Sequence, residues 1–136
     1  MAFATRTLID TGKADGGAGK VVILLDLDDH NASATALDAD GLNGFANGAK
    51  LNIRKIRWGL TSGADDGIGG SALIEFKGAS SDTSAIRLAG SGLYDGPAIN
   101  NNATNTTATS ADIECIPVNT TGFIMIEFSK DAGWTG

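Results

Sequence analysis

The stretch Leu51–Leu60, LNIRKIRWGL, predicts a β-strand around which the rest of the chain is organised. Its first apolar residues, Leu51 and Ile53, occupy odd positions, and strand side chains alternate between the two faces. From Ile56 onward the apolar residues occupy even positions, so the phase changes at Arg54–Lys55. One extra residue, a β-bulge, is the simplest cause, and a strand buried on both sides with a wet middle is the alternative. We expect this stretch to be the central strand of an all-β domain.

The composition predicts the fold class. The 136 residues include 19 Gly but only 2 Pro, and charged residues make up 19% of the chain. Few Lys and Glu mean few good helix formers, whereas Gly, Asn and Asp between short apolar runs are typical of many turns. A chain of this length buries a core without disulfides or metal. With no repeat and no composition shift, we expect residues 1–136 to form a single β-sandwich domain.

Further apolar runs predict strands around the central one. They are Phe3–Ile9, Val21–Leu27, Leu73–Lys77, Ser84–Ala89, Ala111–Val118 and Phe123–Lys130. The run Val21–Leu27, VVILLDL, lacks alternation, which is typical of a strand covered on both faces. In the last strand, the even positions of Ile124–Phe128 share one face, and Phe123 and Met125 lie on the other. Such strands favour an antiparallel two-sheet β-sandwich, jelly-roll-like, with long loops.

The remaining segments are expected to be connections. They are residues 1–19 (an N-terminal strand or arm and a Gly-rich turn), the polar connection Asp28–Gly48 with a possible helical turn at Ser33–Ala39, the compact turn Gly90–Pro97, the surface loop Asn100–Ser110 and the short C-terminal tail 131–136. The loop Asn100–Ser110 has no apolar residue larger than Ala, so it cannot pack a core. The count is then about seven or eight strands of ordinary length.

Charge and hydropathy exclude several classes of partner. The net charge of −6 argues against nucleic-acid binding, which needs a basic footprint. No apolar run approaches the ~18 residues of a membrane span. Arg6 and Asp10 interrupt the N-terminal stretch, so a signal peptide is not expected. Cys115 is the only cysteine, which excludes an internal disulfide and suits a reducing cytosol.

Two motifs resemble enzyme signatures. Val22–Asp29, VILLDLDD, resembles the nucleophile strand of haloacid-dehalogenase-type phosphatases, but the chain after it predicts strands rather than alternating helices and strands. We interpret its aspartates as the exit of a buried strand into solvent. Ala14–Lys20, ADGGAGK, is one residue short of a phosphate-binding loop, because Val21 stands where Ser or Thr would hold magnesium. It leads into a strand, so we interpret it as a hairpin turn.

Metal and nucleophile candidates are equally incomplete. Asp38–Gly44 resembles part of a calcium loop but no Glu follows at the bidentate position; Asp65 and Asp66 could join an irregular calcium site, which stays open. His30 and Cys115 are the only residues of their kinds, and Cys115 fits a small buried thiol better than a nucleophile. We expect no enzyme, no cofactor and no metal.

The residues left over suggest binding to other proteins. The candidate interface residues are Phe3, Arg54, Lys55, Arg57, Phe123, Met125 and Trp134. Aromatic residues, Met and Arg are enriched at protein interfaces. A strand buried on both sides, a tryptophan packed on its own domain, or a solvated basic face would also explain them.

An ordered set of motifs resembles a known family. They are VVILLDLDD, LNIRKIRWGL with Trp58, the turn Leu88–Gly92, Ala111–Ile113, Thr120–Phe123 and Ile124–Lys130. Their order and spacing, over about Lys20 to Lys130, are similar to small virion structural proteins of tailed bacteriophages, many from marine and cyanobacterial hosts. The resemblance implies a virion component, assembled in the host cytoplasm, without catalytic residues.

The resemblance gives the leading expectation for function. It is a capsid decoration (cement) protein, a homotrimer on the outer face of the head, with the major capsid protein or other virion proteins as partners and neither nucleic acid nor membrane among them. A neck, tail or fibre-associated structural protein suits the same sequence. A carbohydrate-binding module, using exposed aromatics such as Tyr94, Trp58 or Trp134, is the alternative from a different class.

Overall fold

The computed structural model describes residues 4–11, 19–30, 32–45, 49–62, 70–78, 82–102, 112–130 and 134, without the side chains of residues 30, 34 and 40. In these ranges the chain forms β1 (Ala4–Asp10), β2 (Gly19–His30), β3 (Ala34–Leu37), the 3-10 turn η2 (Ala39–Gly41), β4 (Leu51–Ser62), β5 (Ser71–Phe76), β6 (Thr83–Ala89), β7 (Ser91–Tyr94), β8 (Ile113–Val118) and β9 (Thr120–Lys130). Within these ranges, no helix has the length and apolar character needed to cross a membrane.

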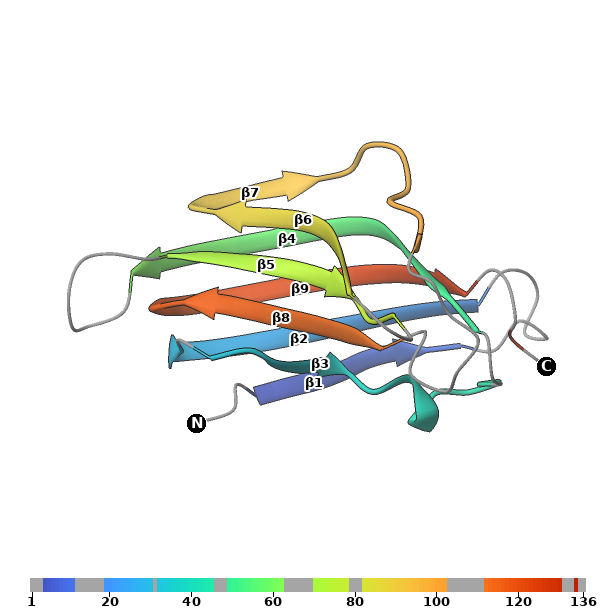
Figure 1. Cartoon of the computed structure of the whole chain (residues 1–136). Helices are drawn as coiled ribbons and strands as arrows, with labels where there is room; N and C mark the ends of the chain where they lie inside the picture. Colours follow the sequence, from blue (N-terminus) through green and yellow to red (C-terminus); the bar gives the residue numbers. More distant parts are fainter. Residues whose placement is uncertain are drawn as a thin grey trace.

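The strands form two antiparallel sheets, which overlap in the view of Figure 1. The five-stranded sheet, called sheet A, has the order β1-β2-β9-β4-β7, and the four-stranded sheet B has the order β3-β8-β5-β6. Only β1–β2 and β5–β6 are consecutive neighbours within one sheet; the other connections pass from one sheet to the other. The expected antiparallel two-sheet β-sandwich is confirmed. The narrower expectation of a jelly roll stays a prediction.

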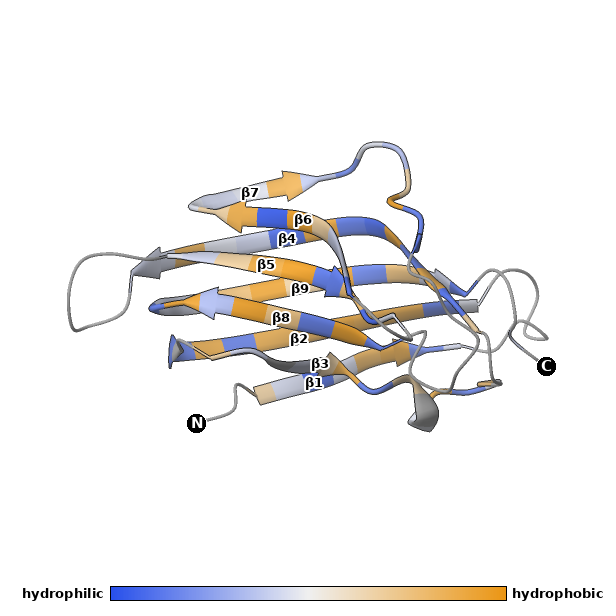
Figure 2. Ribbon diagram, in the orientation of Figure 1, coloured by the Kyte–Doolittle hydropathy of each residue, from blue (hydrophilic) through white to orange (hydrophobic). Residues whose placement is uncertain are grey.

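The core lies between the sheets because alternate residues of each strand face inward. In β2 the odd positions of Val21–Leu27 are buried, and in β9 the even positions of Ile124–Phe128 are buried. Sheet B contributes Ile74 and Phe76, among others, to the same apolar cluster. This alternation is visible along the strands in Figure 2. The predicted faces of β9 are therefore confirmed.

The phase change in β4 is a β-bulge, as expected. Ile53 pairs with Phe128 and Lys55 with Glu127, so Arg54 is the extra residue. Ile53 is fully buried, whereas Arg54 and Lys55 are both exposed. The alternative of a strand buried on both sides is wrong. The expected central position is also wrong, because β9 lies at the middle of sheet A and β4 lies between β9 and the short edge strand β7.

Two expected connections contain strands. In Asp28–Gly48, the segment Ala34–Leu37 is the edge strand β3, paired with β8, so the suggested helical turn is wrong. In Gly90–Pro97, the segment Ser91–Tyr94 is β7, paired with β4. Both strands have four residues, too few for periodicity to show, and both are fixed by partners distant in sequence.

The turn from β6 to β7 passes from sheet B to sheet A, contains a glycine and is covered by tryptophan. Gly90 has φ +60°, in the left-handed region that glycine favours. A Cβ on Gly92 would lie 2.8 Å from Cζ2 of Trp58, so the tryptophan ring needs a glycine beneath it. Trp58 Nε1 donates a hydrogen bond of 3.0 Å to the carbonyl oxygen of Ala89. The motif Leu88–Gly92 is thereby explained as a turn built around Trp58.

Candidate interaction surface

The candidate interaction surface is the face of sheet A that points away from the core. We call it the outer face of sheet A. Its central residues are Val22, Leu24 and Asp26 of β2, Lys55, Arg57 and Gly59 of β4, and Phe123, Met125 and Glu127 of β9. Val22 is only 9% exposed yet lies outside the core cluster, because its neighbours on this face cover it. The strand Val21–Leu27 is thus buried on its inner face and partly covered on its outer face.

The register places an apolar centre beside a row of cations. Met125 lies opposite Leu24 on one side and opposite Arg57 on the other. In the next row, Glu127 lies between Val22 and Lys55. Apolar side chains from β2 and β9 therefore meet basic side chains from β4 across the same face.

Phe123 forms the exposed aromatic part of this face. It lies opposite Gly59, and a Cβ on Gly59 would come within 3.0 Å of the Phe123 ring. The ring stays 38% exposed. The preceding Gly122 has φ +143°, and a Cβ there would clash with the carbonyl oxygen of Gly59. Gly59 thus leaves room for the Phe123 ring, and Gly122 allows the backbones of β9 and β4 to approach closely.

The residues before Phe123 anchor it to the other sheet. The hydroxyl oxygen of Thr120 is fully buried and lies 2.8 Å from the carbonyl oxygen of Ser71 in sheet B. It also lies 2.6 Å from the carbonyl oxygen of Val118. The Thr121 hydroxyl accepts a hydrogen bond of 2.9 Å from the backbone N–H of Asp29. The start of β9 is therefore held on both sides.

Two neighbouring hollows lie over the outer face of sheet A. The first, of about 260 Å³, is lined by Val22, Lys55, Arg57, Met125 and Glu127. The second, of about 410 Å³, is lined by Arg54, Lys55, Asp95, Gly96, Pro97, Ala98 and Glu127. They share Lys55 and Glu127, so together they follow the basic side of the face.

The basic residues of β4 are exposed at the outer face of sheet A. Arg54, Lys55 and Arg57 are exposed, and none of them has an ion-pair partner among the described residues. By contrast, Lys77 and Lys130 are both paired with carboxylates inside the domain.

The outer face of sheet B has the opposite character. Glu75 lies opposite Glu114, and Lys77 Nζ lies 3.0 Å from Glu114 and 3.6 Å from Asp82. Burial raises the pKa of Glu75, and the charges of Asp82 and Glu114 add to this effect. The hydrogen bond with Glu114 raises the pKa of Lys77. The carboxylates of Glu75, Asp82 and Glu114 on this side lie near Lys77, and Arg87, Leu73 and Ile116 share the same face.

Trp134, which sequence reasoning offered as an interface residue, packs on its own domain. It is 7% exposed, and its Nε1 donates a hydrogen bond of 2.7 Å to the carbonyl oxygen of Lys50. Phe45 contacts it edge-on, with ring centroids 5.9 Å apart, and Lys130 Nζ lies 5.0 Å from its ring centroid. These contacts fit the alternative that the sequence also allowed, a tryptophan packed on its own domain, and not an exposed interface residue. Phe3, another candidate, lies outside the described residues.

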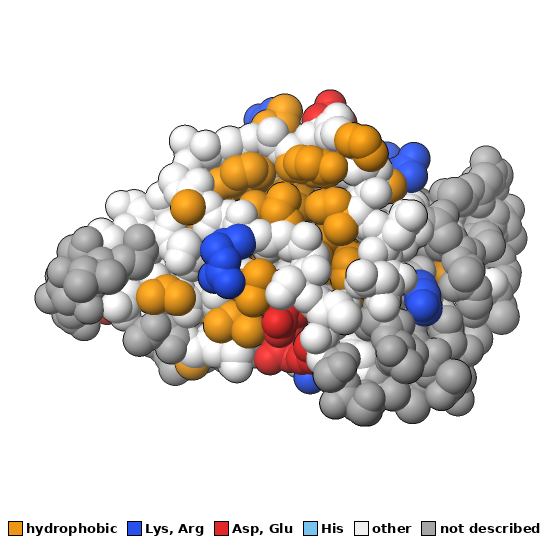
Figure 3. All heavy atoms as spheres, turned by 45° about the horizontal axis from the view of Figure 1, so that its top comes forward, with side chains coloured by type: hydrophobic (Ala, Val, Ile, Leu, Met, Phe, Trp, Pro, Cys, Tyr) orange, Lys and Arg blue, Asp and Glu red, His pale blue; other side chains and the backbone are white. Residues whose placement is uncertain are grey.

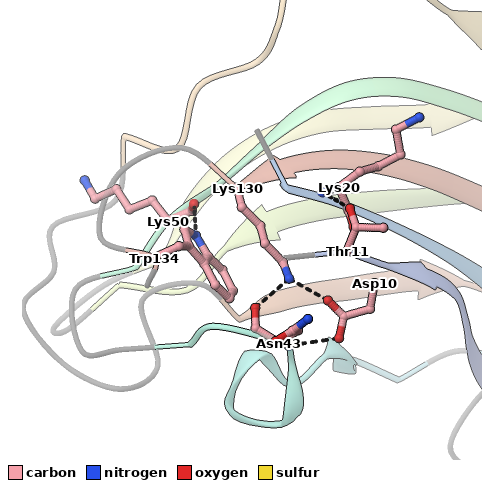
Figure 4. A network of polar contacts seen from close by, with 7 residues as sticks. All are labelled: Asp10, Thr11, Lys20, Asn43, Lys50, Lys130 and Trp134. Atoms are coloured by element: carbon pink, nitrogen blue, oxygen red, sulfur yellow. Dashed lines mark hydrogen bonds and ion pairs between the residues drawn. The ribbon is translucent and has the colours of Figure 1, made fainter. Parts of the chain in front are cut away.

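Lys130 is the most buried charged group of the described chain. It is 0% exposed, and its Nζ donates hydrogen bonds of 2.5 Å to Asp10 Oδ1 and 2.6 Å to the carbonyl oxygen of Asn43 (Figure 4). Asp10 Oδ2 accepts a hydrogen bond of 2.9 Å from the Asn43 N–H. The network joins β1, β9 and the segment after η2, so its role is to hold the fold together.

The enzyme-like motifs do not assemble a site in the described chain. Asp26, Asp28 and Asp29 are exposed along β2, which pairs antiparallel with both neighbours rather than ending at the edge of a parallel sheet. Cys115 is fully buried, as expected, and burial raises its pKa to about 12. Most of Ala14–Lys20 lies outside the described residues.

The calcium candidates are also not brought together. Among the described side chains, no group of three or more His, Cys, Asp or Glu is placed to hold a metal ion. Asp38 is exposed, and Asp65, Asp66 and the side chains of Asp40 and His30 lie outside what the structure describes.

Two of the three aromatic residues proposed for sugar binding, Tyr94 and Trp58, lie near the β6–β7 edge, whereas the third, Trp134, packs against Phe45 and Lys50. Figure 3 brings this edge forward and shows hydrophobic side chains gathered there between charged ones. Trp58, Ala85, Ile86, Tyr94 and Ile99 are partly buried against the core. The Tyr94 hydroxyl donates a hydrogen bond of 2.6 Å to the carbonyl oxygen of Pro97, and Trp58 Nε1 is bonded internally too. Their polar atoms are thus used within the domain.

The sequence analysis named Phe123, Met125 and the three cations, which the structure places on the same face, but it did not name Val22, Leu24 or Glu127. The signal for Val22 and Leu24 was the unbroken apolar run VVILLDL, whose even positions required cover on the outer face. No protein-family model, curated protein or solved structure matches this chain.

Proposed function

We propose that this chain is a virion structural protein, and specifically a capsid decoration (cement) protein of a tailed bacteriophage. It binds across adjoining capsomers and stabilises the head against the pressure of packed DNA. The observation that carries the proposal is the group of apolar residues on the outer face of sheet A, Val22, Leu24, Phe123 and Met125, beside the exposed cations of β4.

The outer face of sheet A differs from an ordinary solvated sheet face. An antiparallel sheet with one face on the core has polar residues on the other face. Here Leu24 and Met125 are half-buried and Phe123 is 38% exposed at the centre of the sheet. Apolar patches that include aromatic residues and Met are typical of surfaces that bind other proteins. This composition supports a role in binding rather than a merely solvated exterior.

The motifs behind the family resemblance have architectural roles, which suits a structural protein. Leu88–Gly92 forms the turn beneath Trp58, and Thr120–Phe123 ties the two sheets and positions the exposed ring. Ile124–Lys130 supplies the centre of sheet A and the buried lysine. Such residues hold a rigid platform in place.

Two finer points belong to the same proposal. The strand orders β2-β9-β4-β7 and β3-β8-β5-β6, with connections that mostly cross between the sheets, support an eight-stranded jelly roll to which β1 adds an edge. The homotrimer belongs to the same proposal, and the apolar β6–β7 edge supports association of the chain with other copies. Analytical ultracentrifugation measures the oligomeric state directly.

The test is the stoichiometry of this chain relative to the major capsid protein in purified virions. A copy number comparable with that of the major capsid protein supports head decoration. A copy number matching one ring of subunits assigns the protein to the neck or tail. Absence from virions, together with a glycan-array signal, overturns the proposal in favour of the carbohydrate-binding module.

A further inference from the structure

We propose that the outer face of sheet A docks an extended acidic segment of the capsid partner. Arg54, Lys55 and Arg57 bind carboxylates of the segment, and an apolar side chain of the segment sits against Val22 and Met125. The identity of the partner rests on the proposed function, whereas the chemistry of the segment rests on the geometry of this face alone.

The bulge in β4 creates the basic side of the docking surface. In a regular strand, the adjacent residues Arg54 and Lys55 would point to opposite faces. Because Arg54 is the extra residue, both are exposed while Ile53 and Ile56 on either side are fully buried. Arg57 follows on the same outer face, opposite Met125. Three cations are thus concentrated within four residues.

The charge of these residues contrasts with that of the whole chain. The protein has 16 Asp and Glu against 10 Lys and Arg, yet three of those ten cations lie together here. None of the three has an ion-pair partner among the described residues. On the outer face of sheet B, Glu75, Glu114 and Asp82 lie beside the paired Lys77 and the separate cation Arg87. An acidic segment is therefore attracted more strongly to sheet A than to sheet B, which orients the protein on its partner.

The shape of the face favours an extended segment over a single anion. The 260 Å³ hollow has apolar walls from Val22 and Met125 and charged walls from Lys55, Arg57 and Glu127. The 410 Å³ hollow continues from it past Arg54. Glu127 repels carboxylates, so the acidic groups of the segment lie on the β4 side and its apolar side chain lies on the β2–β9 side. Alternating acidic and apolar residues, as in an extended strand, satisfy both requirements.

Binding of a defined probe tests this surface without any capsid. The probe is a short fluorescent peptide of alternating glutamate and leucine. Its binding is measured by fluorescence anisotropy at low and at high salt. We expect Arg57→Glu to weaken binding roughly tenfold or more, since close charge pairs at interfaces are worth several-fold to many-fold in affinity. The matched control is Arg87→Glu, an exposed cation of β6 with the same change of charge, which leaves binding unchanged.

Each other outcome has a defined meaning. Failure of the peptide to bind, or equal losses in Arg57→Glu and Arg87→Glu, overturns the docking surface. Tighter binding of a single-stranded DNA of similar length overturns it in favour of a nucleic acid. A self-association that Arg57→Glu abolishes makes a second copy of the chain the occupant, and so also overturns it.

Purified expanded heads then separate this inference from the proposed function. If the wild-type protein binds the peptide but not the heads, head decoration is refuted and the docking surface for an acidic segment still stands. If the wild-type and Arg57→Glu proteins bind the heads equally well, head decoration still stands and the docking surface is overturned. If Arg57→Glu loses head binding while the wild type and Arg87→Glu keep it, the result supports both proposals.

Discussion

Lys130 and Asp10 form an ion pair that joins the last strand of the described chain to the first, with 2.5 Å between Nζ and Oδ1. The lysine side chain is completely buried, whereas the aspartate side chain is 24% exposed. The two residues are therefore not equivalent, because only the lysine depends on its partners for solvation.

Replacing Asp10 with Ala should destabilise the protein by about 3 kcal/mol, because it leaves a buried ammonium group without its carboxylate. Urea unfolding followed by circular dichroism measures the change. The control is Lys77→Ala, which breaks more exposed pairs with Glu114 and Asp82 and should cost about 1 kcal/mol or less. Equal losses of stability in the two variants would show that the burial of Lys130 does not strengthen the dependence of the fold on its ion pair.

Gly122→Ala should destabilise the fold by at least about 2 kcal/mol, since the new Cβ clashes with the Gly59 carbonyl oxygen at an unfavourable φ. Gly41→Ala is the matched control, because a Cβ at Gly41 meets nothing within 4 Å. It should leave stability nearly unchanged or slightly raise it. Thermal unfolding of the two variants under identical conditions compares them, and similar losses would contradict the assignment.

Deletion of Arg54 should leave a folded protein. Without it, Ile53, Lys55 and Ile56 alternate regularly and pair with Phe128, Glu127 and Ile126 in unbroken register. Deletion of Arg57 should instead prevent folding, because it turns Trp58 and Leu60 to the outer face.

Near-ultraviolet circular dichroism and cooperative urea unfolding distinguish the two deletions. We expect the Arg54 deletion to unfold cooperatively with a loss of about 1–2 kcal/mol. A folded Arg57 deletion, or an unfolded Arg54 deletion, would contradict the bulge as the origin of the phase change.

Glu75→Gln should change the pH dependence of stability. The pKa of Glu75 is raised in the folded protein from its usual value of 4.5, mainly by burial and then by Asp82 and Glu114. Its stabilising contribution is therefore complete below the unfolded pKa and is lost as the pH rises through the folded pKa. The variant should match the wild type in acid and have the higher Tm at neutral pH. A lower Tm at neutral pH would reverse the sign and contradict this account.

Cys115 should resist alkylation in the native protein. Burial leaves it 0% exposed and raises its pKa to about 12, so the reactive thiolate is scarce at mildly alkaline pH. We expect iodoacetamide to label it only when urea unfolds the chain, with mass spectrometry as the readout. Rapid labelling without denaturant would show that β8 opens far more readily than an interior strand should.

The sequence was most informative where the fold depends on local alternation. The change of phase after Ile53 predicted the bulge, and the two faces of β9 were read from the spacing of Phe123 and Met125. Both features repeat over enough residues for period two to be visible. The exposure of Arg54 and Lys55 followed from the same pattern.

Features that depend on distant partners could not be predicted in the same way. The four-residue strands β3 and β7 have little periodicity of their own, and pairing with β8 and β4 fixes them. Trp134 follows the last strand in an otherwise small and polar tail, which gave no sign that Phe45 and Lys50 would cover it. The partly covered outer side of Val22 and Leu24 depends on long side chains from three other strands.

The position of β9 at the middle of sheet A has a consequence for biosynthesis. Both β2 and β4 pair with Thr120–Lys130, so they stay unpaired on that side until the ribosome has synthesised residues 120–130. Folding dominated by contacts between distant residues is slow, and its exposed apolar strands are prone to aggregate. A nascent chain stalled before residue 120 should therefore be a substrate for chaperones and proteases rather than a partly folded domain.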